Sequence, residues 1–325
     1  MKVKVNGWRR FGIASLFLAV MILVVAGCGS NETSDEETSG DESTTDKIKV
    51  TATIGMITDV TRHVGGDLTE VSGLMKEGTD PHLYKATPGD IKKLDNAEII
   101  FYNGLYLEAQ MAEIIEQMNS DEKPTVAVGE KLDTSKLIAA DPETGGEYDP
   151  HVWFDVELWT NVTEEIRDAL IAFDPDNKEE YTNNAEAYLA ELQELDAYVQ
   201  EQINTIPEGK RVLITAHDAF GYFGEAYGIE VRGLQGLSTA SEAGSKDTVD
   251  LVNFIVDNES NAVFVETSIS DEAITSVIEG AKKKGHNVVI GGSLFSDAMG
   301  AEGTEEGTYI GMVRHNVDTI VSALK

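Results

Sequence analysis

One order of strand-like and helix-like segments occurs twice in this chain, and this repeat limits the folds open to it. In both halves, short apolar runs alternate with helical patterns, which is typical of α/β lobes with mainly parallel sheets. Sequence identity between the halves is slight, so the repeat predicts a common topology, with two unrelated α/β domains as the alternative. Four pairs of landmarks keep a spacing of 162 to 164 residues: Val50–Val212, Gly66–Gly228, Ile99–Val263 and Val126–Val289.

We expect four strands in each half and a helical region between the halves. An amphipathic segment over residues 155–173 ends at Asp174-Pro175-Asp176. A second helix of about 28 residues, from about residue 177 to 204, is predicted from apolar residues that recur every three or four positions. The expected strands are residues 49–54, 70–74, 98–103, 125–128, 211–215, 230–234, 262–266 and 287–290.

The second helix would run along both lobes, because about 28 residues at 1.5 Å each span about 42 Å. Its stripe could instead form a coiled-coil dimer, but one short stripe between two lobes favours packing within the chain. A single rigid connector predicts small rocking motions of the lobes in place of wide closure. The stripe consists of Tyr181, Ala185, Tyr188, Leu192, Leu195 and Val199.

The N-terminus reads as an export signal. Residues 1–10 hold four bases and no acid, and residues 11–27 are almost wholly apolar. This pattern is typical of a secretory signal, whereas a membrane-spanning helix needs about 20 apolar residues. The run ends at Val25-Ala26-Gly27-Cys28, which resembles the lipobox of bacterial lipoproteins, in which the cysteine becomes the lipidated first residue. A retained anchor helix and an incidental cysteine are the alternatives.

A polar tether follows the cysteine. Between Asn31 and Lys47, seven acids face one lysine, and such a stretch buries too little apolar surface to fold. The predicted organisation is a signal peptide (1–27), the lipidated Cys28 with its acidic tether (28–47), an N-terminal α/β lobe (48–154), a helical connector (155–207) and a C-terminal α/β lobe (208–325). The expected location is the extracytoplasmic face of the cell membrane, held by the lipid anchor.

Charge and cysteine content exclude several classes of protein. The chain has 58 acidic and 25 basic residues and a formal net charge of -33. A field of this sign repels phosphate backbones, so we expect no nucleic-acid partner. One cysteine leaves no disulfide framework and no cysteine-based zinc site.

Three histidines and one aspartate occupy positions where α/β proteins bind ligands, beyond the carboxyl ends of strands. His82 follows the second predicted strand, His151 closes the first lobe, His217 directly follows the first strand of the second lobe, and Asp297 follows the last strand. If these loop ends converge, three imidazoles and a carboxylate make a plausible ligand set for a divalent transition metal.

The triplet Asp-Pro-His occurs twice, ending at His82 and at His151. Proline fixes its own φ and pushes the preceding residue to an extended conformation, so each triplet presets the backbone that aims the imidazole. A single loop histidine is more often only hydrogen-bonded, and we assign that structural or solvent-facing role to His63, His286 and His315.

From the lipobox to the final helix, the sequence resembles the TroA-type (cluster A-I) lipoproteins, the manganese and zinc receptors of bacterial ABC importers. The resemblance implies two pseudo-symmetric α/β lobes joined by one long helix, with the metal between them. It also implies the ligands His82, His151, His217 and Asp297. The blocks that carry it are GTDPHLYKATPGD (78–90), YDPHVWFD (148–155), TAHDAFGYF (215–223), GLQGLSTASEAG (233–244) and GGSLFSDAMG (291–300).

The resemblance leaves two cargo metals open, with Mn²⁺ favoured and Zn²⁺ close behind. Many manganese receptors of this family carry glutamate where this chain has His217, whereas dedicated zinc receptors often have a histidine-rich loop before the second ligand. Residues 139–148 contain no histidine. Three nitrogens and an oxygen suit zinc, which outranks manganese at almost any site.

The implied protein is a single-chain receptor and not an enzyme. It would carry one ion to a permease, and the ATPase would be a separate chain because no Gly-Lys-Ser/Thr phosphate loop is present. Glu266, at a strand end, is a candidate for orienting a ligand imidazole. The alternatives are a surface adhesin that binds metal and, with less support, a zinc-dependent hydrolase, since three histidines can activate water at an open metal position.

Overall fold

The computed structural model describes residues 47–120, 122–141 and 145–325, which belong to one compact unit, Thr45–Lys325. The predicted signal peptide, the lipidated Cys28 and nearly all of the tether lie outside the described residues. In the part of the chain that is described, no helix is both long enough and apolar enough to cross a membrane.

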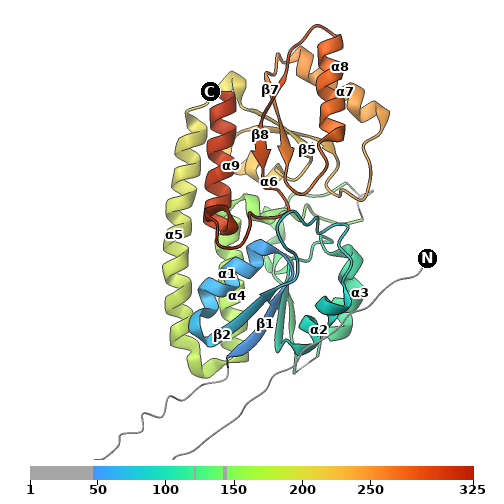
Figure 1. The fold of residues 1–325 in the computed structure, drawn as a ribbon. Helices are drawn as coiled ribbons and strands as arrows, with labels where there is room; N and C mark the ends of the chain where they lie inside the picture. Colours follow the sequence, from blue (N-terminus) through green and yellow to red (C-terminus); the bar gives the residue numbers. More distant parts are fainter. Residues whose placement is uncertain (1–46, 121, 142–144) are drawn as a thin grey trace, which may run out of the picture. The chain divides into compact units, whose positions relative to one another are not determined.

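The N-terminal lobe is a parallel sheet with helices on both sides (Figure 1). The four strands lie in the order β2-β1-β3-β4. Parallel strands need crossover connections, and the helices supply them. The elements are β1 (Ile48–Ala52), α1 (Gly55–Gly65), β2 (Thr69–Gly73), α2 (Pro88–Asn96), β3 (Ile99–Tyr102), α3 (Ala112–Met118) and β4 (Thr125–Ala127).

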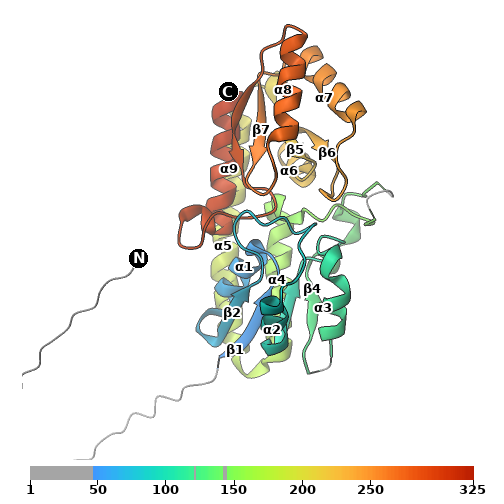
Figure 2. The same cartoon turned by 45° about the vertical axis from the view of Figure 1, so that its right-hand side comes forward.

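The C-terminal lobe repeats this plan with the parallel pairs β5-β6 and β7-β8. In Figure 2, α7 and α8 lie on one side of these strands and α9 on the other. Each lobe's first helix is followed by a glycine with positive φ, Gly66 and Gly228, as the repeat predicted. The elements are β5 (Val212–His217), α6 (Gly221–Tyr227), β6 (Glu230–Gln235), α7 (Ser245–Asp257), β7 (Ala262–Glu266), α8 (Glu272–Lys283), β8 (Val289–Leu294) and α9 (Tyr309–Leu324).

All eight predicted strands occur in the described residues, but several predicted boundaries were wrong, and two of the differences bear on the site. The last strand begins at Val289 and continues to Leu294. Its Gly291-Gly292 pair lay beyond the predicted strand, yet α9 packs so closely that a Cβ on Gly292 would lie 2.3 Å from Thr319 Cγ2. His217 is also the last residue of β5 and does not follow the strand.

The connector consists of α4 (Val156–Phe173) and α5 (Lys178–Asn204). Asp155 caps α4, since its carboxylate accepts hydrogen bonds from the Glu157 and Leu158 amides. The predicted stripe of α5 is buried against α4 of the connector, α1 of the N-terminal lobe and α9 of the C-terminal lobe (Figure 1). The long helix therefore packs within the chain, and the coiled-coil alternative was wrong.

Two clusters of buried apolar side chains form the core of the described residues. The larger one runs from the N-terminal sheet through α4, α5 and α9 into the C-terminal lobe. The smaller one lies between the C-terminal strands and helices α7 and α8. Because the larger cluster crosses from one lobe to the other, wide separation of the lobes would expose apolar surface, which favours small motions.

Candidate metal site

Four buried side chains from four separate segments come together between the lobes. His82 lies in the loop after β2, His151 immediately before the turn Val152–Phe154, His217 at the end of β5, and Asp297 in the loop after β8. Each offers one ligand atom, and these atoms all lie within 4.8 Å of one another. Two of the side chains come from each lobe, so an ion at their centre would join the lobes.

The spacing of these atoms fits a small transition-metal ion. His82 Nε2 lies 3.3 Å from His151 Nε2, and the two oxygens of Asp297 lie 3.4 Å from Nε2 of His151 and of His217. Two ligands that are each about 2.0–2.1 Å from a tetrahedral zinc ion are about 3.3–3.4 Å apart. The distance from His82 Nε2 to Asp297 Oδ2 is wider, at 4.0 Å. Three of these four distances thus match tetrahedral coordination of a small ion, and the fourth is longer.

Three atoms at this centre lack hydrogen bonds. His217 Nε2 and both carboxylate oxygens of Asp297 are buried and have no hydrogen-bond partner among the described residues. Buried polar atoms are nearly always hydrogen-bonded, because leaving one unpaired costs free energy. A cation bound at the centre would satisfy all three atoms, so the donor set fits a metal ion.

Two carboxylates outside the group of four each contact one imidazole. The contact is at Nδ1, the ring nitrogen that does not face the centre. Asp149 Oδ1 lies 2.7 Å from Nδ1 of His151 and accepts the His151 amide at 2.9 Å. Glu266 does the same for His217, with Oε2 2.6 Å from Nδ1 and Oε1 2.9 Å from the amide nitrogen. Each contact fixes the ring and turns Nε2 toward the centre, as carboxylates do behind metal-binding histidines.

Sequence reasoning had singled out Glu266 but assigned no role to Asp149. The available signal was the Asp-Pro-His triplet, because an aspartate two residues before a histidine can reach that histidine's backbone amide. In the first triplet, Asp80 Oδ1 also accepts the His82 amide at 2.9 Å. Its other oxygen accepts a hydrogen bond from Thr239 Oγ1 of the C-terminal lobe at 2.6 Å.

The three imidazoles differ in their affinity for protons. Burial lowers the pKa of His82 to about 3. Burial also lowers the pKa of His151, but Asp149 and Asp297 outweigh it and raise that pKa to about 9. Burial is likewise outweighed at His217, where Glu266 and Asp297 hold the pKa well above its usual value. Burial would raise the pKa of Asp297, yet the nearby imidazoles keep it well below normal.

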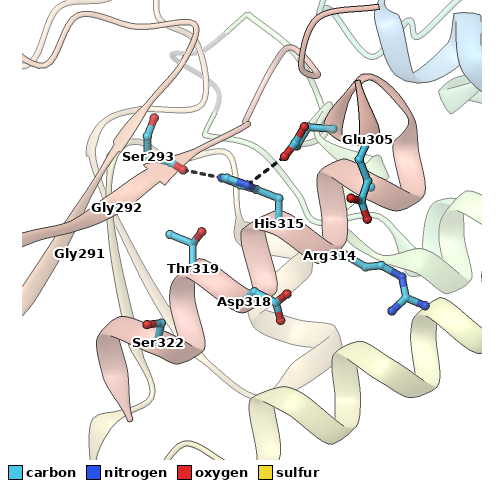
Figure 3. Close-up of a pocket in the computed structure, with 11 residues that line it drawn as sticks. Gly291, Gly292, Ser293, Glu305, Arg314, His315, Asp318, Thr319 and Ser322 are labelled. Carbon is cyan, nitrogen blue, oxygen red and sulfur yellow. Dashed lines mark hydrogen bonds and ion pairs between the residues drawn. The ribbon is translucent and has the colours of Figure 1, made fainter. Parts of the chain in front are cut away.

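The other three histidines lie apart from this group. His63 stacks on Tyr188, and His286 Nε2 lies 2.6 Å from the Ser260 carbonyl oxygen. Figure 3 shows His315 beside a pocket between β8 and α9, facing the Ser293 carbonyl, from which its Nε2 is 3.2 Å away. These contacts agree with structural roles for all three.

Comparison with known proteins gives matches over nearly the whole described chain. The sequence model for the zinc-uptake complex component A, periplasmic (ZnuA), matches residues 50–323. The manganese-binding lipoprotein MntA of Bacillus subtilis is 45% identical over 312 residues, which cover 95% of this chain and 99% of MntA. The zinc-binding protein TroA of Treponema pallidum is 46% identical over 286 residues, or 88% of this chain and 92% of TroA.

The solved structures agree with these sequence matches. The structure of periplasmic zinc-binding TroA from Treponema pallidum superposes with a TM-score of 0.83, at 46% identity, over 86% of this chain and 99% of that one. A more distant relative is PsaA of Streptococcus pneumoniae, named a manganese ABC transporter substrate-binding lipoprotein, which is 32% identical over 95% of this chain and 96% of PsaA. The predicted α/β fold with two lobes and one long helix is confirmed.

Proposed function

Because the chain belongs to the family of the zinc-uptake complex component A, we propose that it is the metal-capturing receptor of an ABC importer. It binds one Mn²⁺ or Zn²⁺ ion per chain and delivers it to a permease that works with a separate ATPase subunit. The family consists of uptake components and not of enzymes. The ligands are His82, His151, His217 and Asp297.

One observation carries this proposal. Three imidazole nitrogens and a carboxylate meet at one buried point, where His217 Nε2 and both Asp297 oxygens have no hydrogen-bond partner among the described residues. Four protein ligands also leave no open position of the kind that zinc hydrolases keep for water. The arrangement therefore supports capture of an ion in preference to chemistry on a substrate.

Binding would join the two lobes through the ion. His82 and His151 come from the N-terminal lobe, and His217 and Asp297 come from the C-terminal lobe. The permease would then recognise the surface of the joined lobes. Since α5 packs on both lobes, the motion between free and loaded forms would be a small rocking of one lobe against the other.

The cargo is Mn²⁺ in preference to Zn²⁺ by a narrow margin. MntA and PsaA are named for manganese and TroA for zinc, so the relatives support both ions. Three of the four distances between ligand atoms suit zinc, which also ranks above manganese in intrinsic affinity. Manganese loading would then depend on metal supply in the cell and on Asp297 binding through both oxygens.

The receptor would be held at the outer face of the cell membrane by lipid on Cys28. The sequence before Cys28 supports this, as do the names of MntA and PsaA, which are lipoproteins. The boundaries 1–27, 28–47, 48–154, 155–207 and 208–325 are part of the proposal. The wild-type chain should incorporate labelled fatty acid and a Cys28→Ser variant should not, and equal labelling of the two would contradict lipid anchoring at Cys28.

Competitive loading tests the proposal directly. Residues 29–325, stripped with a chelator, are offered equal Mn²⁺ and Zn²⁺, and bound metal per chain is counted by mass spectrometry. We expect one tight equivalent that is lost in His217→Ala and retained in His286→Ala, a matched control away from the site. No stoichiometric metal, or unchanged binding in His217→Ala, would overturn the four-ligand site.

A further inference from the structure

Trp153 joins the two loops that carry ligands from opposite lobes. Its side chain is completely buried, directly after His151 and Val152. The indole Nε1–H donates a hydrogen bond to the carbonyl oxygen of Ser296 at 3.0 Å, and Ser296 immediately precedes Asp297. The indole ring also meets the His151 ring edge-on, with centroids 5.2 Å apart. One side chain thus contacts both a ligand of the N-terminal lobe and the loop that holds the carboxylate ligand of the other.

A second hydrogen bond joins the same residue to α9. The phenol of Tyr309, the first residue of α9, donates to the Trp153 carbonyl oxygen at 2.8 Å. Tyr309 is fully buried, and its ring stacks on Trp159 of α4 at 5.1 Å. Trp153 therefore donates to the C-terminal lobe through its indole and accepts from it through its carbonyl.

The N-terminal end of α9 is itself held by the other lobe. The Tyr309 amide donates to Asp59 Oδ2 of α1 at 3.0 Å, and Figure 1 shows α1 close to this end of α9. A carboxylate at a helix N-terminus satisfies a free amide and interacts favourably with the helix dipole. Tyr309 is thus fixed at its backbone by α1 and at its hydroxyl by Trp153.

We infer that Trp153, Ser296 and Tyr309 form an interlobe clamp that sets the distance between His151 and Asp297. Trp153 and Tyr309 are positioning residues, since neither offers an atom to the ion. The inference rests on the proposed metal capture and adds how the two halves of the site are held in register. The spacing of 3.4 Å between His151 Nε2 and Asp297 Oδ1 is the quantity the clamp controls.

The clamp should slow the release of the ion. Loss of the ion requires one ligand loop to swing away, and both clamp hydrogen bonds resist that swing. A buried hydrogen bond contributes about 1 kcal/mol, which corresponds to about fivefold in a rate or an equilibrium constant. The expected effect of removing one bond is therefore about fivefold faster dissociation.

The test compares two pairs of variants of residues 29–325 loaded with Zn²⁺, with dissociation followed by stopped flow into excess chelator. Tyr309→Phe removes the clamp hydroxyl, and its control Tyr181→Phe removes an equivalent hydroxyl that bonds Asp174 in the connector. Trp153→Phe removes the indole donor. Its control is Phe101→Leu, which likewise shrinks a fully buried aromatic side chain, in β3.

We expect faster dissociation in Tyr309→Phe and Trp153→Phe, but not in the two controls, with similar unfolding midpoints within each pair of metal-free proteins. Mn²⁺ loaded into Tyr309→Phe should also give a changed electron paramagnetic resonance spectrum, which a purely structural role would leave unaltered. If Trp153→Phe does not fold, Tyr309→Phe alone decides.

Two failures are distinguishable. A wild-type chain that retains no ion would overturn both the metal-capture proposal and the clamp. One ion bound by the wild type, with dissociation in Tyr309→Phe equal to that in Tyr181→Phe, would overturn the clamp alone.

Discussion

The two Asp-Pro-His triplets have the same sequence and make the same local turn, yet the pKa values of their histidines are shifted in opposite directions. Asp80 and Asp149 each accept the backbone amide of the histidine two residues later, at 2.9 Å in both cases. In this respect the triplets are equivalent. Each turn fixes the direction in which its imidazole leaves the backbone.

The difference lies in the second contact of each aspartate. Asp149 uses the same oxygen to hold Nδ1 of His151, whereas Asp80 gives its other oxygen to Thr239 of the opposite lobe. As a result, the pKa of His151 is raised to about 9, while burial lowers that of His82 to about 3. The short motif thus determines the direction of the backbone, whereas the three-dimensional surroundings determine whether the imidazole is protonated.

The largest expected effect is the loss of the carboxylate behind His151. Asp149→Asn removes the charge that orients the ring, and such substitutions weaken metal binding about 10- to 100-fold. Asp80→Asn should cost much less, because Asp80 does not contact an imidazole nitrogen in the described structure. Isothermal titration with Mn²⁺ and Zn²⁺ measures both, with the exposed helix cap Asp133→Asn as control. Equal losses in the Asp80 and Asp149 variants would contradict the distinction.

The pKa values of the three histidines predict how metal affinity changes with pH. Metal ligation needs neutral imidazoles, so at pH 7 the ion must displace protons from His151 and His217, whose pKa values are raised, but none from His82. Affinity should therefore rise with pH from 7 to at least about 9, with release of up to about two protons per ion. Calorimetry in buffers of different ionisation enthalpy counts these protons. Affinity that is constant between pH 6 and 9 would contradict the assignment.

A smaller effect is expected where Asp80 joins the lobes. Thr239→Val removes one partly buried interlobe hydrogen bond and should speed metal dissociation about three- to fivefold, in line with about 1 kcal/mol for one bond. The spectrum of bound Mn²⁺ should stay unchanged, because no ligand loses its orienting partner. Chelator-driven dissociation measures the rate, and a rate equal to that of the wild type would show that Asp80 acts only within its own loop.

The smallest effect should be shared by both triplets. Pro81→Ala and Pro150→Ala free the unbound loop, and a proline suited to its backbone is worth about 0.4–1 kcal/mol, or roughly two- to fivefold in affinity. Because each proline restricts the backbone before its histidine in the same way, the two variants should lose the same amount of metal affinity. A loss confined to one triplet would show that the turns are not equivalent.

Sequence patterns identified what depends on periodicity and on chain order. The eight strands follow from short apolar runs, and α5 follows from its stripe, beginning at Lys178 within one residue of the expected start. The convergence of His82, His151, His217 and Asp297 follows from the rule that loops at strand carboxyl ends meet. These features depend on local residue types, so the sequence carries them.

Other features depend on contacts between distant segments. The extension of β8 through Gly291-Gly292 depends on how closely α9 approaches, which no local pattern records. The hydrogen bonds from Trp153 to Ser296 and from Tyr309 to Trp153 span 143 and 156 residues. The contact of Asp149 with the His151 ring is local, and it could have been predicted had the aspartate of the triplet been considered as an imidazole partner.

Anomalous X-ray scattering is the measurement that tests the central claim most directly. Crystals of residues 29–325 grown with Zn²⁺ or Mn²⁺ would be measured at the absorption edge of each metal. We predict one strong peak per chain, about 2.0–2.2 Å from Nε2 of His82, His151 and His217 and from the Asp297 carboxylate. A peak at another position, or density without a metal peak between these four side chains in metal-loaded crystals, would contradict the account.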